Sequence, residues 1–183
     1  MSLESIKSLL PEYAKDLKLN LGTVLTPEGA PGLTQIQIYA IALTASIAAR
    51  NRAFSDAVGA IVAPHLDDAT IRAAKSAAAI MAMNNVYYRA THLLSNREYA
   101  NMPAKLRMNI IGAPGIEKVD FELFSLAASA VNGCGMCLDA HERVVVKAGV
   151  TTEGVHSVLR IASVMHAVAT TLEYEQVSLQ QAA

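Results

Sequence analysis

Residues 34–49 read TQIQIYAIALTASIAA, and this stretch decides the fold class. Alanine has the best helix propensity of all residues, and its small side chain lets neighbouring helices approach closely. The same bias runs through the whole chain, which has 32 alanines, no Trp and only 5% aromatic residues. A β-sheet would need alternating segments rich in Val, Ile and Tyr and bounded by turns, and we find no such segment. We therefore predict an all-α helical bundle.

Proline, glycine and capping residues divide the chain into helices. Pro64 stops one helix, and Asp67 or Asp68 caps the start of the next. Residues 84–103 are rich in Asn, Tyr and Arg, so we expect a mixture of short helices and loops there. Gly149 stands where a left-handed C-cap belongs. The expected helices are one or two short ones within 3–20, then about 34–49, one ending at 63, 67–83, 119–131, 134–148, and 152–173 with Thr151 or Thr152 as its cap.

Length and charge limit the classes of function. The chain has 183 residues, 52% of them hydrophobic, and a net charge of −1, which suits one domain over residues 1–183 and is too apolar for a disordered protein. No basic tract could neutralise a run of phosphates, so we expect no nucleic-acid partner. We find neither a long uninterrupted apolar stretch nor a signal peptide, so we expect no membrane association and a cytoplasmic location.

Both cysteines of the chain lie in one motif, residues 132–141, NGCGMCLDAH. Two cysteines two residues apart at a helix start suit a dithiol/disulfide couple, because the free N–H groups of the first turn stabilise a thiolate. His141 follows Cys137 by four residues and Cys134 by seven, so the three side chains share one helical face. The imidazole can then take a proton from a thiol. The spacing favours a thiol redox site.

Two other interpretations of the motif stay open. The cysteines could be ordinary small core residues. Alternatively, C-x2-C-x3-H supplies three zinc ligands, and a closed site would have to borrow a fourth from His156 or His166. The βαβ context that usually accompanies a CxxC redox motif is absent from this helical chain.

From residues alone, Glu122 is interpreted as a favourable first-turn acid on a polar helix face, and the methionines as packing residues.

The two halves of the chain could be one pattern used twice. A shift of 83 residues lays residues 43–46 (LTAS) on residues 126–129 (LAAS). The identities are few, so an internal duplication stays a hypothesis. If it holds, only the half from about 101 to 183 is equipped for chemistry, and the half from about 1 to 100 is not. The same shift lays Asn51, Phe54 and Val58 on Cys134, Cys137 and His141.

Four segments carry a resemblance to a known family: LPEYAKDLKLNL (10–21), AAAIMAMNNVYYR (77–89), LRMNIIGAPGIEKVDFEL (106–123) and AVNGCGMCLDAHE (130–142). The chain resembles the alkyl hydroperoxide reductase D (AhpD) family of the carboxymuconolactone-decarboxylase-like superfamily. The resemblance implies a repeated helical unit, a homotrimer, and no tightly bound cofactor or metal. It also implies an antioxidant peroxidase that regenerates an AhpC-type peroxiredoxin. The electrons would come from dihydrolipoamide on the E2 subunit of a 2-oxo acid dehydrogenase.

The resemblance also assigns roles to residues of this chain. Cys134 and Cys137 would form the redox disulfide, with Cys137 as the sulfenic acid and Cys134 as proton donor, resolving thiol and partner in an interchain disulfide with the peroxiredoxin. His141 and Glu122 would form the proton relay. Some members have a histidine just before the second cysteine, where this chain has Met136. The helix dipole favours Cys134 as the more acidic thiol and the His141 spacing favours Cys137; the resemblance tips the choice to Cys137.

Overall fold

The computed structural model describes residues 2–175, and every regular element in that range is helical, which confirms the all-α prediction. Two 3-10 turns, Glu12–Ala14 and Ala63–His65, accompany the α-helices. The helices are α1 (Leu3–Leu9), α2 (Lys15–Val24), α3 (Gln35–Ala48), α4 (Arg52–Val62), α5 (Asp68–Leu93), α6 (Glu98–Asn101), α7 (Asn109–Gly112), α8 (Lys118–Asn132), α9 (Gly135–Lys147) and α10 (Thr152–Tyr174).

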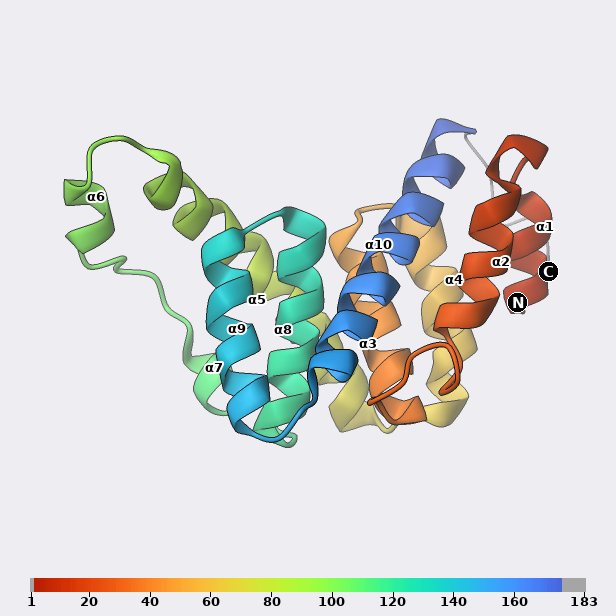
Figure 1. The fold of residues 1–183 in the computed structure, drawn as a ribbon, viewed down its shortest axis with the longest axis horizontal. Coiled ribbons are helices and arrows are strands. Elements are labelled where there is room, and N and C mark those ends of the chain that lie inside the picture. Colours follow the sequence, from red (N-terminus) through yellow and green to blue (C-terminus); the bar gives the residue numbers. More distant parts are fainter. Residues whose placement is uncertain (1, 176–183) are drawn as a thin grey trace.

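Helices α3 and α8 form the centre of the bundle (Figure 1). Helix α3 packs against α4, α5, α8 and α10, and α8 packs against α3, α5, α9 and α10. The consecutive residues Ala40, Ile41 and Ala42 are all fully buried, so α3 is covered on more than one side. Its alanines are needed because larger side chains would hold four neighbouring helices apart.

Capping side chains begin four of the long helices. Thr34, Asn51, Asp67 and Thr151 each accept a hydrogen bond from a backbone N–H in the first turn of α3, α4, α5 and α10 respectively. Gly149 adopts a φ of 97°, the left-handed conformation expected after α9. The predicted caps of α5 and α10 are thereby confirmed.

Helix α5 is longer than predicted. We expected it to end near Met83, but it continues to Leu93, so only residues after 93 form the predicted mixture of short helices and loops. Asn85 is fully buried in this extension, and its side-chain amide donates to the Ser129 hydroxyl of α8 over 2.9 Å. This contact with a neighbouring helix outweighs the weak helix propensity of asparagine.

Helix α10 is long and apolar enough to cross a membrane, by length and composition alone. Polar residues interrupt its apolar stretch, so the amino-acid sequence shows no long uninterrupted apolar segment there. Half of its most apolar window is buried inside the protein, where it packs against α2, α3 and α8. That burial is the behaviour of a core helix.

The segment between α5 and α8 departs from the bundle. Figure 1 shows α6 at the far end of the molecule, carried on an extended stretch of chain. Four large apolar side chains are exposed in and just before this segment: Leu93, Leu94, Tyr99 and Met102.

Candidate active site

The corner between α8 and α9 places both cysteines. Gly133 ends α8 in the left-handed conformation, with a φ of 66°, and turns the chain toward α9. Cys134 is the N-cap of α9. Its backbone N–H donates to the Ser129 carbonyl over 3.1 Å, and its Sγ accepts from the Cys137 N–H over 3.3 Å. The first cysteine therefore sits where the free N–H groups of the helix start stabilise negative charge on sulfur.

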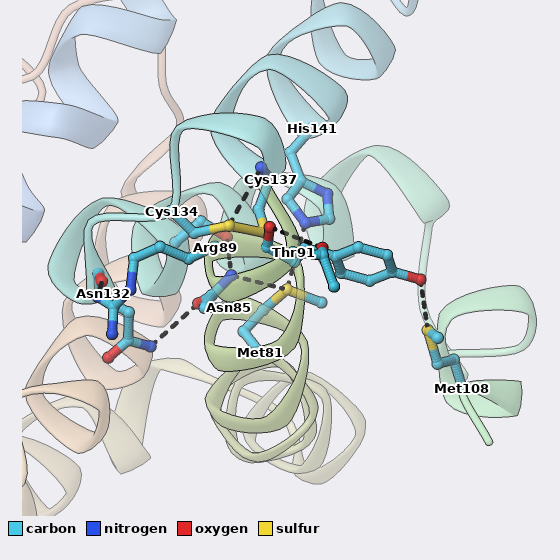
Figure 2. The surroundings of a disulfide bond; sticks show 11 residues. Met81, Asn85, Arg89, Thr91, Met108, Asn132, Cys134, Cys137 and His141 are labelled. Atoms are coloured by element: carbon cyan, nitrogen blue, oxygen red, sulfur yellow. Dashed lines mark hydrogen bonds between the residues drawn. A yellow bond between two sulfur atoms is a disulfide. The ribbon is translucent and has the colours of Figure 1, made fainter. Parts of the chain in front are cut away.

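The two sulfurs are bonded to each other, so the structure shows the oxidised form of the site (Figure 2). The Cα atoms of Cys134 and Cys137 lie 5.3 Å apart. Their exposure differs: Cys134 has no exposed surface, whereas 6% of Cys137 is exposed. Small molecules can therefore reach Cys137 more easily than Cys134.

Glu122 and His141 form a buried pair. The Glu122 Oε2 and the His141 Nδ1 lie 2.6 Å apart, with 4% of Glu122 and 9% of His141 exposed. The interpretation of Glu122 as a first-turn acid is wrong, because the acid in the first turn of α8 is Asp120. Glu122 begins the second turn and is buried, so its carboxylate fixes the orientation of the imidazole ring.

Met81 completes the surroundings of His141. Its Sδ lies 3.2 Å from the His141 Nε2, and the side chain is buried. Met81 comes from α5 and Figure 2 shows it beneath the disulfide. We interpreted it from the sequence as a packing residue, and no spacing signal could have linked it to a histidine 60 positions away.

A hydrogen-bond network holds the corner before Cys134. The Asn132 amide donates to the Asn85 Oδ1 over 3.0 Å, and Asn85 in turn donates to Ser129. Arg50 donates to the Asn132 Oδ1 over 3.1 Å, and Arg89 donates to the Asn132 carbonyl. The sequence did not predict the hydrogen bonds that Asn132 makes with Asn85, Arg50 and Arg89. Asn85 and Arg89 lie in a segment that carried the family resemblance, but nothing in it indicated these contacts.

A pocket of about 400 Å³ opens beside Cys137. Cys137 and His141 both line it, and Cys134 does not. Apolar side chains form most of its wall. The other lining residues are Met81, Asn84, Tyr88, Met108, Ile111, Met136, Ala140 and Arg143. The pocket therefore suits a molecule with an alkyl part and a small polar group near the sulfur.

The structure does not bring together the zinc ligands that the sequence suggested. Within residues 2–175, no group of three or more His, Cys, Asp or Glu side chains is arranged to hold a metal ion. His156 and His166, the proposed fourth ligands, lie exposed on α10. The structure instead brings together the four residues that the family resemblance had singled out, Cys134 joined to Cys137 and Glu122 bonded to His141.

Known proteins match this chain along nearly its whole length. The model of the carboxymuconolactone decarboxylase family matches residues 97–175. The chain is 57% identical to the alkyl hydroperoxide reductase AhpD of Rhodospirillum centenum, covering 96% of this chain and 92% of that protein. It is 51% identical to AhpD of Brucella anthropi, covering 94% and 97%, and 48% identical to AhpD of a Bradyrhizobium species, covering 100% and 99%. The chain belongs to the AhpD family, within the carboxymuconolactone decarboxylase superfamily.

Proposed function

We propose that this chain is an alkyl hydroperoxide reductase that works through the Cys134–Cys137 dithiol. The observation that carries the proposal is the shared pocket: Cys137 and His141 line one largely apolar cavity, and Glu122 holds the His141 ring from behind. The relatives named above are alkyl hydroperoxide reductases, and the pocket has room for an alkyl chain.

In the first step, the reduced Cys137 becomes a thiolate. The His141 Nδ1–H donates to the Glu122 carboxylate. In the oxidised form the His141 Nε2 contacts the Met81 Sδ. In the reduced form, the lone pair of that Nε2 accepts the Cys137 thiol proton. The thiolate then attacks the terminal oxygen of the hydroperoxide. The O–O bond breaks, the alkoxide takes a proton from Cys134 and leaves as the alcohol, and Cys137 becomes a sulfenic acid.

In the second step, the Cys134 thiolate attacks the Cys137 sulfur, and the sulfenic O–H leaves as water after it takes the proton that His141 accepted from the Cys137 thiol. The product is the disulfide of the oxidised form. Over both steps, two thiols and one hydroperoxide give one disulfide, one alcohol and one water. Cys134 is suited to the resolving role because its sulfur caps α9, where a thiolate is stabilised.

The disulfide is then reduced by thiol–disulfide exchange with dihydrolipoamide carried on the E2 subunit of a 2-oxo acid dehydrogenase. The two lipoyl thiols become the lipoyl disulfide. We also propose that Cys134 forms the mixed disulfide when the protein reduces an AhpC-type peroxiredoxin. Because Cys134 has no exposed surface, this exchange requires the start of α9 to open. We propose the cytoplasm as the location of this chemistry.

We propose that the protein is a homotrimer held by helix packing. Both cysteines are committed to the site, so the assembly would use apolar contacts, for which the exposed Leu93, Leu94, Tyr99 and Met102 are candidates. Light scattering at micromolar concentration should give three times the chain mass. A monomer would refute this assembly.

We infer that the chain contains a duplicated three-helix unit. Helices α3 and α8 begin at residues 35 and 118, and α4 and α9 at residues 52 and 135, which are the same 83 positions apart. Helices α5 and α10 follow in the same order. The matching bounds support the duplication more strongly than the few sequence identities do.

The peroxidase proposal is tested by separating the two half-reactions. The reduced protein should lose two thiols per chain when one equivalent of cumene hydroperoxide is added, and should release cumyl alcohol. Dihydrolipoamide should then restore both thiols. A protein whose thiols survive the hydroperoxide would contradict the proposal.

A further inference from the structure

Two neighbouring asparagines of α5 differ in their hydrogen bonding. Asn84 and Asn85 are both buried, with 4% and 0% of their surface exposed. The Asn85 amide donates to Ser129 and its Oδ1 accepts from Asn132. The Asn84 Oδ1, by contrast, has no hydrogen-bond partner within residues 2–175. A buried polar atom without a partner lowers the stability of a protein, so such an atom calls for an explanation.

The position of Asn84 supplies that explanation. Met81, Asn84 and Tyr88 are spaced by three and four residues, so they lie on one face of α5, and all three line the pocket beside Cys137. Asn85 lies on a different face and contacts α8. Among the polar side chains of the pocket, Arg143 is exposed, and the Tyr88 hydroxyl donates to the Met108 Sδ over 3.9 Å. The two ring nitrogens of His141 contact Glu122 and the Met81 Sδ. The Asn84 amide is the buried uncharged group that remains to contact a polar substrate atom.

We propose that Asn84 binds the hydroperoxide group of the substrate. Its Oδ1 has no exposed surface in the oxidised form, so the side-chain amide turns in the reduced form, and the Oδ1 then accepts the hydrogen bond from the terminal O–H in the pocket. This inference rests on the peroxidase function proposed above. A hydroperoxide has one hydrogen-bond donor, and it belongs to the oxygen that Cys137 attacks. Holding that O–H at Asn84 therefore places the reacting oxygen in the pocket that Cys137 lines.

The same hydrogen bond serves the product of the attack. The Cys137 thiolate gives its electron pair to the terminal oxygen, the O–O bond breaks, and the alkoxide takes its proton from Cys134. The terminal oxygen keeps its own hydrogen and becomes the sulfenic O–H, which stays bonded to the Asn84 Oδ1. When Cys134 closes the disulfide, this O–H takes the proton held by His141 and leaves as water. Asn84 itself neither gains nor loses a proton.

The test is Asn84→Leu, which keeps a branched side chain and removes the amide. We expect it to slow oxidation of the two thiols by about ten- to a hundredfold, because one positioned hydrogen bond to the reacting group is lost. The loss should be similar for hydrogen peroxide and cumene hydroperoxide, since both carry the O–H. Reduction of the oxidised variant by dihydrolipoamide should stay at the wild-type rate, because that step involves no hydroperoxide. The melting temperature should not fall, since an unpartnered buried oxygen is removed.

Ser125→Ala is the matched control. The Ser125 Oγ is the other buried side-chain atom without a partner within residues 2–175, and Ser125 is not among the residues that line the pocket. This variant should retain both half-reactions at the wild-type rate. If Asn84→Leu destabilises the fold, Asn84→Ala is measured in the same way.

The outcomes separate this inference from the proposed function. Wild-type rates of oxidation in the folded Asn84 variants would overturn the role of Asn84 and leave the peroxidase function intact. Equal slowing of oxidation and reduction would also overturn it, because general damage to the site would be the cause. A wild-type protein that no hydroperoxide oxidises would overturn the function itself, and the role of Asn84 with it.

Discussion

Two helix corners of this protein have the same backbone construction and different chemistry. At the start of α4, the Asn51 side chain accepts from the Phe54 N–H over 2.8 Å. At the start of α9, the Cys134 side chain accepts from the Cys137 N–H over 3.3 Å. A shift of 83 residues superimposes the two caps in the sequence. The comparison teaches that free N–H groups at a helix start do not make a redox site by themselves.

The residues around each cap, from its own helix and from the helix before it, decide the difference. In the second corner, His141 is held by the buried Glu122. The matching positions of the first corner are Val58, which is buried in the core, and Tyr39, whose ring lies 5.1 Å from that of His65. The first corner therefore lacks a base as well as a thiol.

The proposed units are α3–α5 and α8–α10, and the third helix of each unit packs against helices of the other unit. Helix α5 packs against α8 and α9, which brings Met81 and Asn84 to the cysteine corner. At the first corner the partner comes from α10, where Glu173 accepts from the Asn51 amide over 2.7 Å. Each corner is thus completed by side chains from the opposite half of the chain.

The largest effect is expected from the cysteines. Cys137→Ser and Cys134→Ser should each abolish lipoamide-dependent peroxide turnover, because the cycle needs both sulfurs. Asn51→Ser, at the matching cap of α4, should leave turnover unchanged. Retention of more than about a tenth of the activity in either cysteine variant would reject the cycle.

The next effect concerns the Glu122–His141 pair. His141→Gln should slow thiol oxidation by about 10²- to 10⁴-fold, because it removes the base, and Glu122→Gln by about ten- to a hundredfold, because it removes only the group that orients the base. Oxidation by both variants should require higher pH, because the base of the thiol is absent in His141→Gln and weakened in Glu122→Gln. The rate constants are measured by quenched-flow thiol titration.

A double variant separates a relay from two independent contributions. His141→Gln combined with Glu122→Gln should be barely slower than His141→Gln alone, because the carboxylate acts through the imidazole. If the two losses multiply instead, Glu122 and His141 act separately and the relay is wrong.

A third prediction concerns Phe54, where a substitution should lower stability and leave the activity of the folded protein unchanged. Phe54 corresponds to Cys137 and is fully buried, so Phe54→Ala should lower the free energy of unfolding by about 3–5 kcal/mol. The folded fraction should still oxidise its thiols at the wild-type rate. Urea unfolding and thiol oxidation are compared with those of Cys137→Ser, which should lose activity and little stability. Loss of thiol oxidation in folded Phe54→Ala would show that the two corners are not separable.

The smallest expected effect is a pH-dependent contribution to stability from the cap of α5, Asp67, which the cap of α10 does not make. Asp67 forms hydrogen bonds with the Thr70 backbone N–H and with the Thr70 side chain. These bonds, the backbone one most strongly, lower the pKa of the Asp67 carboxyl below its usual value. A lowered pKa in the folded state means that the stabilisation is present at neutral pH and is lost as the pH falls through it. Thr151, the cap of α10, does not titrate.

Urea unfolding at about pH 6 and about pH 3 measures this contribution. Asp67→Asn keeps a capping side chain and should reduce the loss of stability between the two pH values. Thr151→Asn should leave that loss as it is. An unchanged pH dependence in Asp67→Asn would show that other carboxyl groups are responsible for it.

Local signals gave most of the fold. Alanine content indicated helices, and the caps Asp67 and Thr151 were visible because capping depends on residues three positions apart. The cysteine motif was visible for the same reason. The extension of α5 was missed because it depends on contacts with α8, which no local pattern encodes.

The rest of the site depends on contacts distant in sequence. Glu122 and His141 are 19 positions apart, and only the family resemblance linked them. The Met81 contact and the hydrogen bonds of Arg50 and Arg89 to Asn132 span 43 to 82 positions. Spacing rules for a single helix cannot find such partners, because the helix packing that joins them is set by the whole core.

The most direct test of the central claim is a joint measurement of metal and thiols. Freshly purified, reduced protein is assayed for zinc, and its thiols are titrated before and after one equivalent of cumene hydroperoxide. The account predicts no stoichiometric zinc, the loss of two thiols per chain, and a disulfide between Cys134 and Cys137 in the digested peptide. Stoichiometric zinc with thiols that do not react with the hydroperoxide would contradict it.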